Sequence, residues 1–393
     1  MTKPLNILVA NPFAQVTSGN DEALMRLMAK IDRDRFRFVV AQPGESPYSD
    51  AYRHMGAIVE TIPMSIIRRD LSHTFLLRYF RGFLPTIYRF IALIRRHSVD
   101  IVHTNTTQIL GAGAAARLMG LPSIYHVHSV SIEKPEWVSR LLATWVSWTG
   151  DMLLSNSRAS GGIFLKRGFP PDKFVALGNP IDPKEYGRPG AREEVRRELG
   201  LGDGPLIGLV GRIARVKSIE YFINAAAICA KDFPSARFIV VGGPGTPADS
   251  AYFEELKKQV NGLGLNDKFS FIGRRNDVPR IMAAIDVLTL TSSSEGFGLV
   301  LIEAMAGAVP VVGSRVGGVA EIISDGEDGF LVPYGDAHAI ADSIKTLLKD
   351  PARAKRMGQA GREKVTRLFS SDRLAKQLEG IYLSLVRYKM TDY

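Results

Sequence analysis

The strongest constraint on the fold is the rhythm of the chain, in which thirteen short apolar runs alternate with segments of helical periodicity. Most of these runs are continuously apolar, which indicates strands that are buried on both faces. Strand–helix–strand alternation predicts parallel sheets covered by helices, and hence the α/β class. The predicted strands are 5–10, 37–41, 57–62, 100–105, 123–129, 152–157, 174–179, 206–212, 237–243, 268–274, 287–293, 309–314 and 329–334.

Two domains accommodate these strands better than one, because thirteen strands exceed the size of a typical twisted sheet. A length of 393 residues also favours two domains. Segment 181–204 is rich in Gly, Pro and charge and contains no strand candidate, so it marks the boundary. We therefore expect two doubly wound Rossmann-like domains over 1–185 and 186–369, followed by a helix over 370–393.

Composition excludes several classes of protein. The 46% hydrophobic and 23% charged residues are typical of a globular protein, not of a disordered or fibrous one. No run approaches the roughly 18 apolar residues of a membrane-spanning helix, and the N-terminus lacks the pattern of a signal peptide. The single cysteine, Cys229, excludes an internal disulfide and a cysteine zinc site, and is expected to be a buried helix residue. These features favour a cytoplasmic protein.

The net charge of +10 indicates anionic partners, and more than half of it comes from segment 66–97. Basic residues with interleaved aromatics favour a helix lying on an anionic membrane, peripheral to the inner face of the cell membrane. The alternative is a pair of ordinary amphipathic helices packed on the sheet. No other segment resembles a nucleic-acid motif, so nucleic acid is disfavoured. The arginines are Arg68, Arg69, Arg78, Arg81, Arg89, Arg95 and Arg96, against one acid, Asp70.

The segment 294–313, SEGFGLVLIEAMAGAVPVVG, predicts a ligand site at the end of a strand. A turn after the strand leads into a helix near Gly298, whose free N–H groups favour phosphate. Glu295 precedes the helix, and Glu303 lies inside it on the side that tilts back towards the turn. Two carboxylates suit hydroxyl groups better than phosphate. A sugar nucleotide supplies both hydroxyls and a diphosphate.

A second signal is VGRIARVK, in which Arg212 and Lys217 follow the end of a strand. These cations suit a diphosphate leaving group, which needs positive charge as its bond to the sugar breaks. The Asp-x-Asp pair, Asp32 and Asp34, lies in a charged run that is typical of a solvated loop. We therefore expect a metal-independent site with no cofactor beyond the donor.

Taken together, these motifs resemble the retaining glycosyltransferases of family 4, which have the two-Rossmann GT-B architecture. Glu295-x7-Glu303 is similar to the paired-glutamate motif of the family, and GRIARVK to its Gly-Arg-x4-Lys motif. The stretch Asn179–Asp182 stands where many members have Asn-Gly-Val-Asp, and His128 stands at the position of the family's histidine. The order and spacing of the motifs extend the resemblance over nearly all of the chain.

The resemblance implies roles for the donor site. Glu303 would bind the ribose hydroxyls and Glu295 the hydroxyls of the donor sugar. Arg212 and Lys217 would hold the diphosphate, and Arg274 would lie near the base. Backbone N–H groups of the turn would reach the sugar or the β-phosphate; this turn comprises Gly296, Phe297, Gly298 and Leu299.

The resemblance also implies that His128 faces the transferred sugar and that the C-terminal helix crosses back onto the first domain. Members often carry Gly-Gly in the first strand-to-helix loop, whereas this chain has only Gly19 there. Gly243 would permit a tight turn that lies near the donor, or else a turn with no role beyond the fold. Asn156 would face the ligand or cap the next helix.

The histidines allow further interpretations. His126 and His128 share one face of a strand, and with His103 they raise the possibility of a metal cluster. Buried, hydrogen-bonded histidines are the commoner outcome, and we read His126 as structural.

These expectations combine into a retaining glycosyltransferase that moves a hexose-type sugar from a nucleoside diphosphate to an acceptor hydroxyl. The basic segment favours a lipid-linked or membrane-proximal glycan acceptor, in the assembly of a polysaccharide, lipopolysaccharide or glycolipid. Alternatives are a soluble family member that glycosylates a small metabolite, a sugar-nucleotide epimerase, and a non-catalytic sugar-nucleotide-binding protein.

Overall fold

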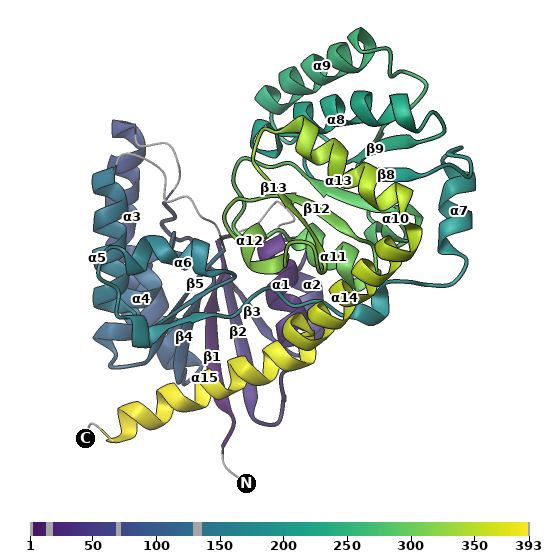
Figure 1. The fold of residues 1–393 in the computed structure, drawn as a ribbon. Helices are drawn as coiled ribbons and strands as arrows, with labels where there is room; N and C mark the ends of the chain where they lie inside the picture. The colour runs from purple at the N-terminus through teal and green to yellow at the C-terminus, as the bar shows by residue number, and fades with distance from the viewer. Residues whose placement is uncertain (1–2, 13–18, 68–71, 129–135, 392–393) are drawn as a thin grey trace. The chain divides into compact units, whose positions relative to one another are not determined.

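The computed structural model describes residues 3–12, 19–67, 72–128 and 136–391 (Figure 1). It divides into two compact units, each built around its own parallel sheet. Unit 1 comprises Met1–Pro180 and Ser371–Tyr393, and unit 2 comprises Ile181–Ser370.

Unit 1 contains a seven-stranded parallel sheet in the order β3-β2-β1-β4-β5-β6-β7. Its strands are β1 (Leu5–Ala10), β2 (Phe36–Gln42), β3 (Ile58–Thr61), β4 (Ile101–Thr104), β5 (Ser123–Val127), β6 (Met152–Ser155) and β7 (Phe174–Ala176). Its helices are α1 (Gly19–Met28), α2 (Ser49–His54), α3 (His73–Arg96), α4 (Leu110–Leu118), α5 (Glu136–Thr149), α6 (Arg158–Leu165) and α15 (Ser371–Thr391), with the short η1 (Pro171–Lys173).

The two faces of this sheet are covered by different helices, as its alternating side chains require. Ile7 and Val9 of β1 belong to a core with α1, α2 and α15. Leu8 and Ala10 belong to a second core with α3 and α4. The terminal helix α15 therefore supplies part of the core of unit 1, which confirms the predicted return of the C-terminal helix to the first domain.

Unit 2 contains a six-stranded parallel sheet in the order β10-β9-β8-β11-β12-β13. Its strands are β8 (Leu206–Val210), β9 (Arg237–Val241), β10 (Phe269–Gly273), β11 (Val287–Leu290), β12 (Val311–Ser314) and β13 (Gly329–Val332). Its helices are α7 (Ala191–Glu198), α8 (Ile219–Asp232), α9 (Pro247–Gly262), α10 (Val278–Ala284), α11 (Leu299–Ala306), α12 (Val319–Ile322), α13 (Ala337–Lys349) and α14 (Pro351–Phe369), with η2 (Pro183–Glu185) and η3 (Arg215–Lys217).

All thirteen predicted strands are present, and the two doubly wound sheets confirm the predicted fold class. Several strands end earlier than predicted, because the polar residues after them bond elsewhere. Ser157, for example, caps α6 by accepting a hydrogen bond from Ser160 N. Cys229 is buried in α8, as expected.

Within the basic segment 66–97, residues His73–Arg96 form one long helix, α3, where the alternative interpretation expected a pair. Ser72 caps its first turn by accepting a hydrogen bond from Phe75 N, and Pro85 lies inside the helix on an exposed position. Arg68, Arg69 and Asp70 lie outside the described residues.

Three histidine rings stack inside unit 1, between β4, β5 and α15. The ring centroids of His103 and His126 lie 5.5 Å apart, and those of His126 and His128 lie 4.1 Å apart. The Oη of Tyr382, on α15, lies 2.7 Å from His103 Nδ1. Burial lowers the pKa of His103 to about 4 and that of His128 to about 3, and it holds the pKa of His126 well below its ordinary value. The rings are therefore neutral at physiological pH.

This stack should make the protein sensitive to acid. A histidine of the unfolded chain titrates near pH ~6.5, so below that pH the unfolded state binds more protons than the folded state. The slope of unfolding free energy against pH is then positive, and stability falls as the pH is lowered. We expect a loss of up to about 1.4 kcal/mol per pH unit for each of these histidines between about pH 6 and pH 5. Urea unfolding at several pH values across this range measures the free energy of unfolding and tests the expected loss. His103→Gln should flatten the profile, and an unchanged profile would contradict the account.

Gly113 of α4 should tolerate no side chain. A Cβ there would overlap the Oη of Tyr125, which is fully buried and hydrogen-bonded to Thr149 Oγ1 at 2.9 Å. In α6, by contrast, a Cβ at Gly162 would meet no atom within 4 Å. We expect Gly113→Ala to destabilise unit 1 by roughly 1–3 kcal/mol and Gly162→Ala to stabilise it by roughly 0.5–1 kcal/mol through helix propensity. Denaturant unfolding of both variants checks this; an equal gain in both would contradict it.

Candidate active site

The candidate donor residues of unit 2 lie at the carboxyl ends of β8, β9, β10 and β11. From β8 the chain adds strands in one direction through β9 and β10, and from β11 it adds them in the other direction through β12 and β13. The boundary between β8 and β11 is the topological switch point of the sheet, where open α/β sheets bind their ligands. Two of the predicted residues, Lys217 and Glu295, meet across this boundary.

Lys217 follows β8 and forms an ion pair with Glu295, which follows β11. Ser292 Oγ donates a second hydrogen bond to the same carboxylate oxygen at 2.7 Å, and Thr291 Oγ1 donates to Lys217 O at 2.9 Å. The side chains of Lys217 and Glu295 are 22% and 13% exposed, so the pair is largely shielded from water. A cation and a carboxylate are thus held side by side at the edge of the sheet.

The turn that carries Glu295 rests on two glycines of the loop after β12. Gly318 N donates to Glu295 O at 3.0 Å, and a Cβ at Gly317 would overlap the same carbonyl. Gly298 caps α11 with a left-handed φ of 101°, a conformation that glycine adopts without strain. This supporting pair was not among the residues predicted from the sequence, although two adjacent glycines shortly after a predicted strand are typical of such a contact.

Helix α11 begins at Leu299, directly after this turn. The backbone N–H groups of Phe297, Gly298 and Leu299 belong to its amino end, where the helix dipole favours anions. Glu303 lies one turn further along α11 and is half-buried, and Gly296 belongs to the same turn as Glu295. The predicted turn and its two glutamates therefore occupy one short strand-to-helix connection.

Arg212, the other predicted cation, is more open to solvent than Lys217. Its side chain is 56% exposed, and its Nη1 lies 3.9 Å from Asp249 Oδ2. Gly242 allows the backbone after β9 to approach this loop, since a Cβ there would overlap Gly211 O. Arg212 is thus available for an anion at the same strand ends as Lys217.

Arg274 lies after β10, where its Nη2 donates to Pro244 O at 2.9 Å. Its side chain passes over Gly243, because a Cβ at Gly243 would lie 3.2 Å from Arg274 Cγ. The backbone of Gly243 is also bonded to the loop after β8, because Ile213 N donates to Gly243 O at 3.1 Å. The strand ends β8, β9 and β10 are therefore interlocked.

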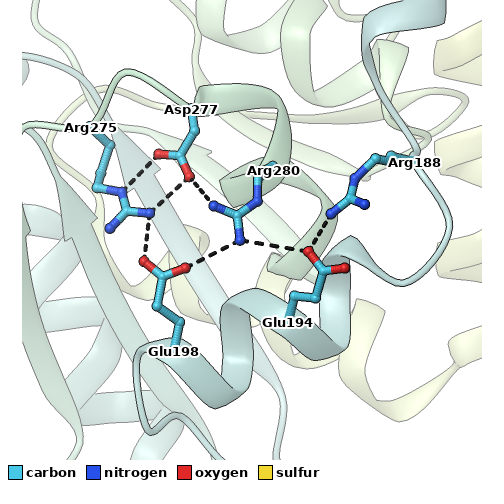
Figure 2. Close-up of polar contacts among 6 residues, drawn as sticks. All are labelled: Arg188, Glu194, Glu198, Arg275, Asp277 and Arg280. Atoms are coloured by element: carbon cyan, nitrogen blue, oxygen red, sulfur yellow. Dashed lines mark hydrogen bonds and ion pairs between the residues drawn. The ribbon is translucent and has the colours of Figure 1, made fainter.

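An ionic network anchors the loop that follows Arg274 (Figure 2). Arg275 binds Asp277 and Glu198, each at 2.8 Å, and Arg280 binds Asp277 at 2.8 Å and Glu198 at 3.2 Å. Hydrogen bonds from Arg275 hold the pKa values of Asp277 and Glu198 below their ordinary range. The network joins α7 to α10 and to the loop that follows Arg274. The network was not predicted from the sequence, because Glu198 is distant in sequence from Arg275, Asp277 and Arg280.

In unit 1, His128 lies directly after β5 and is held by both neighbouring strands. Its Nε2 lies 2.9 Å from Asn105 Oδ1, after β4, and Asn156 Nδ2, after β6, donates to its carbonyl oxygen at 3.0 Å. The low pKa of His128 makes the ring neutral, so the hydrogen bond to Asn105 Oδ1 assigns the proton to Nε2. Nδ1 is then a buried acceptor that has no partner among the described residues. Asn156 supports the backbone instead of capping α6, and Asn105 was missed.

Gly19 is the first residue of α1 rather than part of the loop after β1. The loop residues 13–18 lie outside the described part of the chain, so the role of Gly19 stays a prediction. Asp32 and Asp34 form a turn in which Asp34 N donates to Asp32 Oδ1 at 3.0 Å. Within the described ranges, no three acidic, histidine or cysteine side chains are grouped as a metal site.

Family comparisons match both units. The family described as glycosyl transferases group 1 matches residues 191–364, and the glycosyltransferase family 4 description matches residues 24–185.

Several curated proteins are similar over much of the chain. Alpha-maltose-1-phosphate synthase of Mycolicibacterium smegmatis is 32% identical, covering 72% of this chain and 79% of its own length. Alpha-D-kanosaminyltransferase of Streptomyces kanamyceticus is 29% identical, covering 82% and 87%. N-acetyl-alpha-D-glucosaminyl L-malate synthase of Bacillus anthracis is 32% identical, but the chain spans only 55% of that relative.

Among solved structures, HepE of Anabaena with bound UDP aligns with a TM-score of 0.85 at 23% identity, covering 97% of this chain and all of the other. WaaG, a glycosyltransferase of lipopolysaccharide biosynthesis, aligns with a TM-score of 0.68 at 18% identity, covering 95% and 99%. These two structures share the fold of this chain. The motifs, the two family matches and the 32% identical relative show that the chain belongs to the group 1 glycosyltransferases of family 4, and its fold is the GT-B architecture.

Proposed function

We propose that this protein is a retaining glycosyltransferase that moves a hexose-type sugar from a nucleoside diphosphate to an acceptor hydroxyl without a metal ion. The observation that carries the proposal is the Lys217–Glu295 pair at the switch point of unit 2. The pair supports the proposal because a cation that can bind diphosphate lies beside a carboxylate that can accept hydrogen bonds from sugar hydroxyls. HepE, which shares the fold, was solved with UDP-glucose, which supports a nucleotide-sugar donor.

In the proposed donor complex, Glu303 accepts hydrogen bonds from the ribose and Arg274 lies near the base. Arg212, Lys217 and the amino end of α11 hold the diphosphate. Phosphate competes with Glu295 for Lys217, so donor binding frees the glutamate to accept hydrogen bonds from the sugar. The groups that stabilise negative charge on the diphosphate are then in place before the reaction begins.

The proposed reaction breaks the bond between the anomeric carbon and the β-phosphate oxygen. Arg212 and Lys217 offset the charge that grows on this oxygen. The acceptor oxygen forms its bond to the anomeric carbon on the same face, and its proton passes to the departing phosphate. The anomeric configuration is thereby retained without an enzyme nucleophile. His128 would face the transferred sugar.

The proposed acceptor is a lipid-linked or membrane-proximal glycan, because α3 exposes arginines and large apolar side chains together. The proposed contact is peripheral. No helix within the described ranges has the length and apolarity needed to cross a bilayer. A small-metabolite acceptor is the rival, and N-acetyl-alpha-D-glucosaminyl L-malate synthase is a relative whose name indicates one. Turnover that rises on addition of anionic vesicles supports the first acceptor class, and turnover indifferent to lipid supports the second.

Donor binding should depend on Glu303 and Lys217 but not on Arg215, a neighbouring cation that pairs with Glu255 instead. We expect one class among UDP-, GDP-, ADP- and dTDP-sugars to raise the melting temperature of the wild type. Binding at 100 times the dissociation constant stabilises the folded state by about 2.7 kcal/mol. Glu303→Ala and Lys217→Met should lose this shift, whereas Arg215→Met should keep it. A shift that survives in Glu303→Ala would contradict the assigned donor site, and no shift with any donor would contradict the function.

The stereochemistry and metal dependence of the reaction can be read from its product. Proton NMR of a product formed from an α-linked donor should show an α-glycoside, and a chelator such as EDTA should leave the rate unchanged. Lys217→Met should lower kcat by roughly 100-fold or more, since it removes a group that acts on the leaving phosphate. A β-linked product, or activity abolished by EDTA and restored by Mg²⁺ or Mn²⁺, would refute the retaining or the metal-independent part of the proposal respectively.

A further inference from the structure

All three tryptophans of the chain lie on one helix, α5. Trp145 is built into the fold: its ring contacts Phe83 of α3 at 5.5 Å, and its Nε1 donates to Leu110 O at 3.3 Å. Trp137 and Trp148, in contrast, are 57% and 54% exposed, and Leu141 between them is 60% exposed. Their spacing of four and seven residues places these three side chains on one face of the helix. Packing therefore explains Trp145. It explains Trp148 only in part: its ring lies 5.4 Å from that of Trp145 and 5.3 Å from Arg117 Cζ, yet about half of the side chain is exposed.

Helix α3 carries a matching exposed stripe. Its members are spaced by three, four and four residues and are 66–74% exposed; they are Leu77, Phe80, Leu84 and Tyr88. Of the twelve large apolar side chains that are exposed in the described part of the chain, seven lie on α3 and α5. Such a concentration of apolar surface is typical of an interaction site rather than of random exposure.

The two stripes meet at the contact between Phe83 and Trp145. Phe80 lies one turn before Phe83, and Leu141 and Trp148 lie one turn before and after Trp145, so each stripe borders that contact. Figure 1 shows α3 and α5 beside each other on the same side of the sheet. Helix α4 packs against both of them, and at Gly111 it lies so close to α3 that a Cβ there would be 2.8 Å from Thr86 Cγ2. We name this combined face the α3–α5 surface.

The charges around the α3–α5 surface are mostly positive. Helix α3 contains five arginines and no acidic residue. Arg96 pairs with Glu60 and Arg89 donates to Pro63 O, but Arg78, Arg81 and Arg95 have no ion-pair partner among the described residues. On α5, Arg140 is neutralised by Glu136. A second copy of the chain docked here would oppose arginine to arginine, whereas an anionic lipid surface is complementary to them.

We propose that the α3–α5 surface docks onto an anionic lipid bilayer, with Trp137 and Trp148 at the level of the head groups and Trp145 retained inside the protein. Tryptophan and tyrosine favour the membrane interface, where an apolar ring and a polar edge are both satisfied. Leu77, Phe80 and Leu84 supply the apolar contact, and the free arginines contact lipid phosphates. The proposal deepens the proposed function by naming the membrane partner of unit 1, and it rests on that function only for the conclusion that the acceptor is lipid-linked.

Because every tryptophan lies on α5, intrinsic fluorescence of the full chain reports on this helix alone. Vesicles of equal parts phosphatidylglycerol and phosphatidylcholine should shift the emission of Trp145→Phe, which keeps Trp137 and Trp148, to shorter wavelength. Brominated lipid should quench the same protein. The double variant Trp137→Phe/Trp148→Phe keeps only Trp145 and should show neither effect while still sedimenting with the vesicles. Emission of Trp145→Phe that vesicles leave unchanged would overturn the proposal.

Charge reversal tests the arginines against a matched control. Arg78→Glu/Arg81→Glu should lower partitioning into the anionic vesicles at least 25-fold, at roughly fivefold per cation removed. The control, Lys355→Glu/Arg356→Glu, changes the net charge equally on α14 of unit 2, where both side chains are exposed, and should leave partitioning within about twofold of wild type. Equal losses in both variants, or equal binding to pure phosphatidylcholine, would overturn a specific anionic surface.

Measurements of oligomeric state and of donor binding distinguish membrane docking from dimer formation and from the glycosyltransferase proposal. Light scattering should show a monomer without vesicles; a concentration-dependent dimer that shields Trp137 would overturn the proposal in favour of a second copy of the chain. No donor is present in these assays, so failed vesicle binding leaves the glycosyltransferase proposal intact. Conversely, the loss of every donor-induced melting shift would refute that function without affecting the membrane result.

Discussion

The candidate site depends on the burial of parallel strands on both faces. Such strands have no polar side to present to water, so the polar residues of each strand–helix repeat gather where the strand ends. Parallel orientation places all of these ends at one edge of the sheet. Lys217 and Glu295, which are 78 residues apart in sequence, meet for this reason. The same rule in unit 1 brings Asn105, His128 and Asn156 together from three successive strands.

Two different physical devices hold these strand ends in place. Around Glu295 and Arg212 the backbone is packed so closely that glycine is required, as at Gly242 and Gly317, where any Cβ would overlap a carbonyl oxygen. Around Arg274 the anchoring is ionic and runs through Arg275, Asp277 and Glu198. The first device brings backbone segments of neighbouring loops into close contact, and the second ties the loop after Arg274 to α7.

The buried interior of unit 1 and its exposed α3–α5 surface differ in the charge of their side chains. Inside, it keeps the imidazoles of His103, His126 and His128 neutral, so that His128 presents an acceptor nitrogen instead of a positive charge. Outside, α3 and α5 leave large apolar side chains in contact with solvent, beside arginines of α3 that have no ion-pair partner in the part of the chain that the structure describes. Exposing these apolar side chains to water costs free energy, and contact with a lipid interface would remove that cost.

The sequence by itself determined the fold class, the thirteen strands, the basic segment and the turn that contains Glu295 and Glu303. These features are local, because the hydrophobic period, the positions of glycines and the spacing within a motif each depend on residues that are close together in sequence. Only the tertiary structure decided that Lys217 pairs with Glu295, that Asn105 sets the tautomer of His128, and that α5 joins α3 in one apolar surface. These are contacts between elements distant in sequence, and their geometry follows from strand order and helix packing, which no local pattern specifies.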